Sequence, residues 1–240
     1  MRLPQLGESP DSGPFWLPPA YFLAALIWLA GTAVGLLAVG PDLARGLVFQ
    51  PRVFALTHAL TLGVVGSTIF GALQQFIPAV LGVGPRHPRA AVAGFWLFQF
   101  GIAVLLVGFW RSRPAWQSLG WVLLIGGIGM ASWNTLPALR RATRNHQVGL
   151  YVTLGHSALG FAALTAAIRI GDGLGWWHTG REGLLAAHLH LGALGFGTLT
   201  AVGFGSKMLP AFPGRPSHAP DPSPGSAGRP APVCCSSVPG

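Results

Sequence analysis

Long runs without a charged residue alternate with short clusters of charge along this sequence. About 20 residues of helix cross a hydrocarbon core of about 30 Å. The uncharged runs are all at least this long, and they cover 12–41, 53–85, 90–110, 114–139, 145–168 and 183–206. Strands of a membrane barrel would need alternating polar positions, which these runs lack. The pattern therefore predicts an all-α polytopic bundle of about six transmembrane helices, near 17–39, 53–82, 90–110, 115–139, 146–169 and 183–211.

Polar segments flank the predicted membrane domain of 17–212. Residues 1–16 form a polar N-terminal segment, and their acidic residues and prolines do not match a cleavable signal peptide. Residues 213–240 are rich in Pro, Gly and Ser, a composition that does not form a helix or a core. Two interpretations of this end stay open: a disordered tail, or a chain that is truncated or out of frame after Pro213.

Two of the predicted spans align with each other without a gap when one is shifted by 132 positions. The shift places 58–79 on 190–211 and His58 on His190. The other identities are Leu62 with Leu194, Gly63 with Gly195, Thr68 with Thr200, Gly71 with Gly203, Pro78 with Pro210 and Ala79 with Ala211. The same shift places the first predicted span on the fifth. The sequence thus predicts an internal four-helix repeat, and membrane proteins often bind ligands where repeats meet.

Basic residues in every loop account for the formal net charge of +9. Nucleic-acid-binding proteins concentrate such charge on one face or element, so we exclude nucleic acid as a partner. Nine basic residues on the N-terminal side of the membrane against six on the other favour an N-terminus in the cytoplasm. The only cysteines, Cys234 and Cys235, are adjacent and match no zinc site.

Histidines within the predicted spans are the candidate ligands, because ionisable residues are costly to place in a membrane. His58, in the second span, can offer an imidazole nitrogen to a metal, above all to heme iron. The small residues after it fit either a flat partner or close helix packing. They are Gly63, Gly66, Ser67 and Gly71.

Two more candidates form a His-x-His in the sixth span. His188 and His190 lie about 200° apart on a helix of 3.6 residues per turn, so they cannot chelate one metal together and face different surroundings. His156, in the middle of the fifth span, must find a partner inside the bundle, as an interface residue, a ligand or a proton relay. Paired carboxylates and nucleotide-binding motifs are absent from the sequence, and no catalytic residue is predicted.

These segments resemble subunit I, the large subunit of heme-copper oxidases and nitric oxide reductases. The stretch from His58 to Pro78 is similar to the second helix of that subunit, which bears a heme-ligating histidine. His188-Leu189-His190 is similar to its His-x-His, whose two members bind the two hemes. The resemblance is stronger still to single-chain bacterial membrane relatives of this subunit.

The resemblance implies a b-type heme bound by His58 with His190 or His188, and electron transfer to a redox partner or to other membrane subunits. The family's copper-site signatures, a histidine followed by Pro-Glu or Val-Glu and a paired His-His, are absent from the sequence. A copper–heme reaction centre is therefore not implied, and any activity would be that of a respiratory-type oxidoreductase. The alternative is a cofactor-free structural or transport protein whose histidines and glycines only pack helices.

Overall fold

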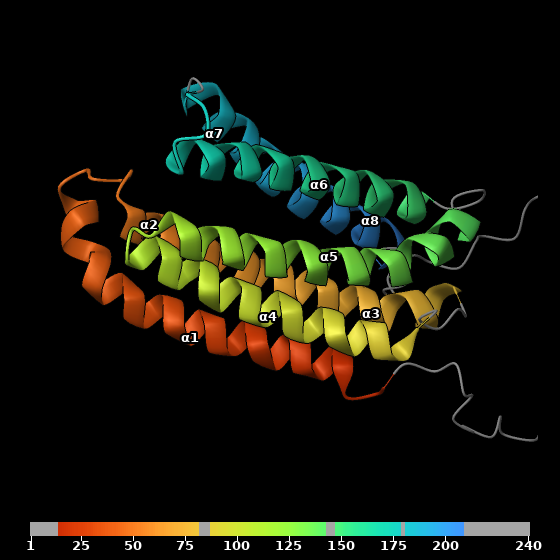
Figure 1. The fold of residues 1–240 in the computed structure, drawn as a ribbon. Coiled ribbons are helices and arrows are strands. Elements are labelled where there is room, and N and C mark those ends of the chain that lie inside the picture. Colours follow the sequence, from red (N-terminus) through yellow and green to blue (C-terminus); the bar gives the residue numbers. More distant parts are fainter. Residues whose placement is uncertain (1–13, 82–86, 143–146, 179–180, 209–240) are drawn as a thin grey trace, which may run out of the picture.

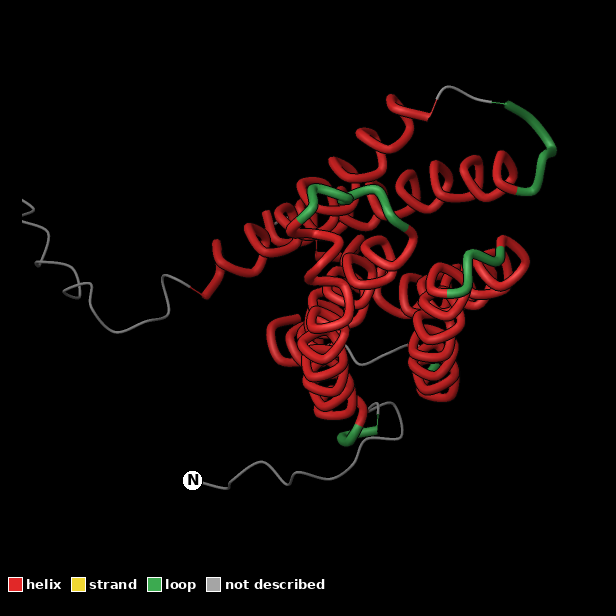
Figure 2. Tube along the Cα trace, turned by 90° about the vertical axis from the view of Figure 1, so that its left-hand side faces the viewer, coloured by secondary structure: helices red, strands yellow, loops and turns green. Residues whose placement is uncertain are grey.

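A computed structural model describes residues 14–81, 87–142, 147–178 and 181–208, and these form helices and loops only (Figure 2). Six helices are long and apolar enough to cross a membrane: Leu17–Ala44, Pro51–Pro78, Pro88–Trp110, Pro114–Pro137, Gln147–Gly173 and Gly183–Ser206. The predicted all-α bundle of six spans is confirmed. The predicted tail of 213–240 lies outside the described residues, as does most of the segment 1–16.

The second and sixth spans each combine two α-helices with a π-helical segment between them. In chain order the elements are α1 (Leu17–Ala44), α2 (Pro51–His58), η1 (Ala59–Gly66), α3 (Ser67–Leu81), α4 (Pro88–Trp110), α5 (Pro114–Ala142), α6 (Gln147–Gly173), α7 (Arg181–Leu189), η2 (His190–Thr198) and α8 (Leu199–Met208). Figure 1 shows α1 to α5 as one group of roughly parallel and antiparallel helices, with α6 and α8 packed together along it.

Prolines begin three of the spans. Pro51, Pro88 and Pro114 occupy the first positions of α2, α4 and α5. Proline suits this position because its missing N–H would have no partner within the helix and its φ is already helical. The chain then reverses sharply between α4 and α5, where Ser112 adopts a φ of 51° and the N–H of Arg113 donates to a carbonyl of α4.

Glycines at seven-residue spacing bring α4 and α5 into backbone contact. Gly101 and Gly108 of α4 face α5, and Gly120 and Gly127 of α5 face α4. A Cβ atom added at any of the four would lie 2.5–2.7 Å from a backbone nitrogen of the other helix. Small residues allow such an approach in membranes, where van der Waals packing holds helices together. These two helices are therefore the most closely packed pair of the bundle.

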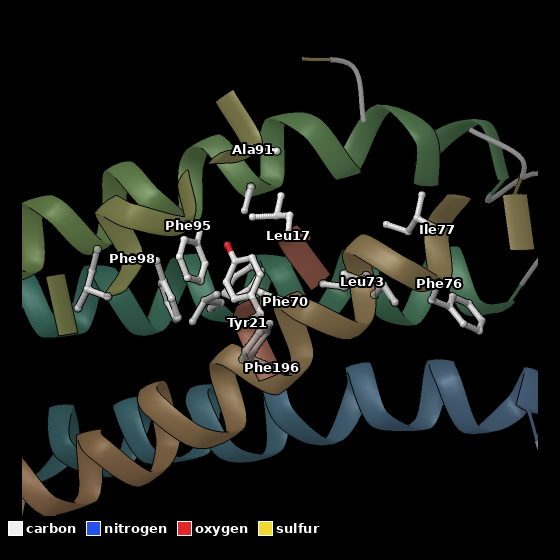
Figure 3. Packing of buried hydrophobic residues seen from close by; sticks show 14 of the residues in the cluster. Leu17, Tyr21, Phe70, Leu73, Phe76, Ile77, Ala91, Phe95, Phe98 and Phe196 are labelled. Carbon is white, nitrogen blue, oxygen red and sulfur yellow. The ribbon is translucent and has the colours of Figure 1, made fainter. Parts of the chain in front are cut away.

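Aromatic side chains fill the middle of the bundle (Figure 3). The ring centroid of Phe70 in α3 lies 5.0 Å from that of Phe98 in α4 and 5.8 Å from that of Phe196 in η2. Tyr21 of α1 meets Phe95 of α4 edge-on at 4.8 Å. Such aromatic pairs contribute about 0.5–1.5 kcal/mol beyond the area they bury. The core thus joins the first three spans to the sixth.

A short polar chain crosses this core. The indole N–H of Trp28 in α1 donates to Oε1 of Gln99 in α4 (2.8 Å), and Nε2 of Gln99 donates to Oγ of Ser67 in α3 (3.0 Å). Ser67 is fully buried. Because hydrocarbon offers no hydrogen bonds, polar groups in a span must satisfy one another, and here they link three spans.

The second and sixth spans share a backbone irregularity. Shifted by 132 positions, η1 falls on 191–198, which lies within η2. Helices of the π type are rare, appear mostly as short insertions in α-helices, and are frequent at functional sites. These segments were not predicted from the sequence, and they begin directly after His58 and at His190.

The glycine that follows each π segment also packs alike in the two spans. A Cβ added at Gly71 would lie 2.9 Å from Cβ of Tyr21 in α1, and one added at Gly203 would lie 3.0 Å from Cβ of Tyr151 in α6. Gly71 therefore allows α3 to approach α1 in the same way as Gly203 allows α8 to approach α6. The four-helix repeat as a whole stays a prediction.

Large apolar side chains cover the outside of the bundle. Leu26, Ile27 and Leu37 of α1 are 62%, 63% and 81% exposed, and Phe161 and Leu164 of α6 are also exposed. Soluble proteins rarely expose contiguous apolar surface on this scale. A lipid bilayer is the environment that suits this surface.

Candidate histidine site between the second and sixth spans

The structure brings His58 of α2 beside His188 of α7. The centroids of the two imidazole rings lie 6.0 Å apart, and the ring planes are inclined by 30°. Both side chains are partly buried, and both helices lie at the same end of the bundle (Figure 1). Two candidates 130 positions apart in the sequence therefore meet.

The ring of His58 is held by its own helix and by α4. Nδ1 lies 2.7 Å from the carbonyl oxygen of Phe54, one turn earlier. Since a carbonyl only accepts, Nδ1 carries the proton and donates, which leaves the lone pair on Nε2. Phe109 of α4 stacks on the ring at a centroid distance of 4.9 Å. The imidazole is thus fixed in orientation and in tautomer, with Nε2 as an acceptor.

The ring of His188 is held by α6. Its Nδ1 lies 2.9 Å from the carbonyl oxygen of Ala162 and 3.2 Å from Oγ1 of Thr165. The Ala162 carbonyl accepts the proton of Nδ1, so Nε2 again keeps its lone pair. Metal-ligating histidines commonly donate their other N–H to a carbonyl in this way, which sets the tautomer and orients the ring.

His190 faces different surroundings from His188, as the predicted 200° separation requires. Its Nδ1 lies 2.7 Å from the carbonyl oxygen of Ala186, and the residue is exposed. His190 therefore repeats the local hydrogen bond of His58, its counterpart in the aligned spans. The structure places His188, and not His190, against His58.

His156 lies inside the bundle, as predicted. It is 7% exposed, its Nδ1 lies 2.8 Å from the carbonyl oxygen of Val152, and its ring meets those of Phe70 and Phe196 edge-on. It belongs to the aromatic core and not to the pair of His58 and His188.

The glycines after His58 pack against aromatic side chains. A Cβ added at Gly63 would lie 2.6 Å from Cγ of Trp28, and one added at Gly66 would lie 3.2 Å from Cζ of Phe98. Ser67 is engaged by Gln99. Of the two interpretations of these small residues, the structure favours close packing, so a flat ligand would have to lie elsewhere around the histidine pair.

The site offers two donor nitrogens, Nε2 of His58 and Nε2 of His188. With each metal–nitrogen bond about 2 Å and each nitrogen about 1 Å from its ring centre, two imidazoles that bound one metal would have centroids up to about 6 Å apart, and the observed 6.0 Å lies at this limit. Within the described residues no group of three or more His, Cys, Asp or Glu side chains gathers as a metal site. Two imidazoles alone do not complete a structural zinc site, which takes four ligands, whereas a heme brings four nitrogens of its own.

Phe109 and Thr165 are supporting residues that the sequence did not reveal. A hydroxyl in an apolar span was the only signal for Thr165, and Phe109 had none.

The chain was compared with known protein families, with curated proteins and with solved structures, and no family, curated protein or solved structure matches it.

Proposed function

We propose that this multi-pass protein of the bacterial inner membrane binds a b-type heme between His58 and His188 and takes part in electron transport. The observation that supports this most is the pair of imidazole rings 6.0 Å apart, each with Nδ1 bonded to a backbone carbonyl. The sequence resemblance to the large subunit of heme-copper oxidases points to the same cofactor.

Residues of four elements would hold and orient the proposed heme. His58 and His188 would hold the iron through their Nε2 atoms, and the carbonyls of Phe54 and Ala162 would keep both rings in the tautomer that leaves Nε2 free to bind. Phe109 covers one face of His58 and excludes water from it. A heme with two histidine ligands has no open iron position, so it transfers electrons and does not activate oxygen.

The location of the pair in the membrane defines the kind of redox partner. With the N-terminus in the cytoplasm, as the loop arginines favour, His58 and His188 lie toward the outer surface. A partner that exchanges electrons with this site would then be a periplasmic protein or another membrane subunit that reaches the outer half of the bilayer.

The second candidate function is that of a cofactor-free structural or transport protein. The packing of Trp28 and Phe98 against Gly63 and Gly66 favours it, because these glycines then serve helix contacts alone. In that protein His58 and His188 would only join the second and sixth spans.

An absorption spectrum of the purified full-length protein, reconstituted with hemin in detergent, tests the proposal. We expect a Soret band with the red-shifted visible bands of a low-spin, bis-histidine heme. His58→Ala and His188→Ala should each reduce the bound heme at least tenfold, because either change removes one of the two axial nitrogens. His190→Ala is the matched control on the same span and should keep the band.

Two results would contradict the proposal. If no Soret band co-elutes with the folded protein in size-exclusion chromatography after free hemin is removed, the cofactor-free candidate is the better one. If His190→Ala removes the band and His188→Ala retains it, the heme is bound by His58 and His190 instead.

A further inference from the structure

The sixth span exposes far more of its surface than the second span, with which it aligns. In the most apolar part of each span, 39% of the residues of the second span are buried, against 11% of those of the sixth. The two spans are otherwise built alike, since each has a π-helical segment at the same place and a following glycine packed against a tyrosine of the preceding span. The difference therefore lies in what covers them.

One helix, α4, covers a single side of the second span. Its Phe109 stacks on His58 at a centroid distance of 4.9 Å. Its Phe98 lies 5.0 Å from Phe70, and a Cβ added at Gly66 would lie 3.2 Å from Cζ of the same ring. Residues spaced by multiples of four share one side of a helix. The residues of the second span that meet α4 have this spacing, and they are Phe54, His58, Gly66 and Phe70.

The corresponding side of the sixth span is exposed. A shift of 132 positions carries the four residues that meet α4 to Ala186, His190, Thr198 and Val202, and each of these is exposed. Leu194, which continues the same four-residue spacing, is 58% exposed. We call this side the open face, and its residues are Ala186, His190, Leu194, Thr198 and Val202. Among the described residues, the sixth span thus lacks a counterpart of α4 on this side.

The polarity of the open face does not suit lipid. Nδ1 of His190 donates to the carbonyl of Ala186, so Nε2 keeps its lone pair. Ionisable side chains within spans almost always face protein or a water-filled cavity, because hydrocarbon offers them no hydrogen bonds. The exposed side of α1, with Leu26 and Ile27, is by contrast apolar. The open face therefore calls for a protein segment, whereas α1 suits lipid.

The second span indicates which kind of segment fits. There α4 runs opposite to the span and lays phenylalanine rings over His58 and Phe70 (Figure 1). A helix on the open face meets a similar surface, with the imidazole of His190 in the place of that of His58. The other side chains of this face are small or aliphatic, and close van der Waals packing of such residues holds helices together in membranes.

We propose that the open face binds a transmembrane helix of another membrane protein, which covers the sixth span as α4 covers the second. This helix runs opposite to the sixth span and places an aromatic ring over His190. A second copy of this chain suits the face less well. A two-fold axis through it would bring together the Nε2 lone pairs of two His190 side chains, and neither nitrogen has a proton to share. The open face includes neither His58 nor His188, so the inference is independent of the proposed heme.

Labelling in native membranes with a lipid-soluble carbene reagent, mapped by mass spectrometry, tests the proposal. We expect Leu194 and Val202 to be labelled severalfold less than Leu26 and Ile27 of α1, because the partner helix shields them while lipid surrounds α1. In the full chain purified and reconstituted without other proteins, at the same density in the membrane, all four should be labelled alike, since all four are exposed.

Two outcomes of the labelling would overturn the proposal. Equal labelling of the four residues already in native membranes shows that the open face meets lipid. Protection of Leu194 and Val202 that persists in the pure protein assigns the face to a second copy of this chain.

Two tryptophan variants test whether the partner lies on this face. Val202→Trp adds an indole where the partner helix packs, so the labelling of Leu194 in native membranes should rise to that of Leu26. Val34→Trp adds the same group to the exposed side of α1 and should leave Leu194 protected. If Val202→Trp folds and Leu194 stays protected, the helix that shields it does not lie on the open face. If Val202→Trp does not fold, Thr198→Phe replaces it, with the same expectation and the same contrary outcome.

Discussion

Replacing Gly127 by leucine should destabilise the protein by about 3 kcal/mol or more, toward the upper end for overpacked sites. A Cβ at this position would lie 2.6 Å from the backbone nitrogen of Phe98, and backbone cannot rotate away as a side chain can. The two helices would have to separate and lose the contacts along their whole interface. The measurement is the thermal midpoint of unfolding in detergent, together with the folded fraction in size-exclusion chromatography.

The control for this prediction is Gly129→Leu on the same helix. Gly129 is exposed, and an added Cβ would have no neighbour within 4 Å, so the variant should keep the stability of the original protein. Equal midpoints for Gly127→Leu and Gly129→Leu would show that α4 and α5 do not approach each other as described.

Replacing Gln99 by leucine should lower the free energy of unfolding by about 1–3 kcal/mol, which is the second largest expected effect. The change removes both hydrogen bonds of the chain from Trp28 to Ser67 and leaves two polar groups inside the membrane without that partner. Unfolding in detergent measures the loss. Gln75→Leu is the matched control, because Gln75 is exposed and the same atoms are replaced there.

A double-mutant cycle sharpens the test on Gln99. If Gln99→Leu acts through Ser67, the combination with Ser67→Ala should cost less than the sum of the two single changes. Strictly additive effects would indicate that the amide of Gln99 does not bond to that serine.

The spans could be predicted from the sequence because a bilayer imposes a minimum length of uncharged helix. The observed ends of the spans differ from the predicted ends by a few residues, because prolines such as Pro51 and Pro88 begin a helix earlier than the apolar run suggested. Which spans pack together was harder to predict from the sequence. The seven-residue spacing of Gly101 with Gly108 was visible in the sequence, but it became informative only once the matching glycines of α5 were seen opposite.

The candidate site was predictable in part. The aligned spans singled out His58, and the His-x-His supplied two possible partners 200° apart. The choice between His188 and His190 depends on how the sixth span is rotated about its axis, which contacts with Ala162 and Thr165 of another span determine. No pattern within the span itself contains this information.

The polar groups around His156 show a different limit. Thr200 is an ordinary residue in its own segment, and only the packing of the sixth span against the fifth brings its hydroxyl against Gly155, the neighbour of His156. Long-range proximity of this kind leaves no local trace in a single sequence.

The π-helical segments have a consequence for the phase of the two spans that contain them. A π turn takes about one residue more than an α turn, and one residue corresponds to about 100° of rotation on an α-helix. The helix that follows η1, α3, is therefore rotated about the span axis relative to α2. For this reason one continuous span can direct His58 to one neighbour and Phe70 to another. Deleting a single residue between Ala59 and Gly66 would bring the span back into α-helical phase, and the histidine pair and the aromatic core could no longer both form.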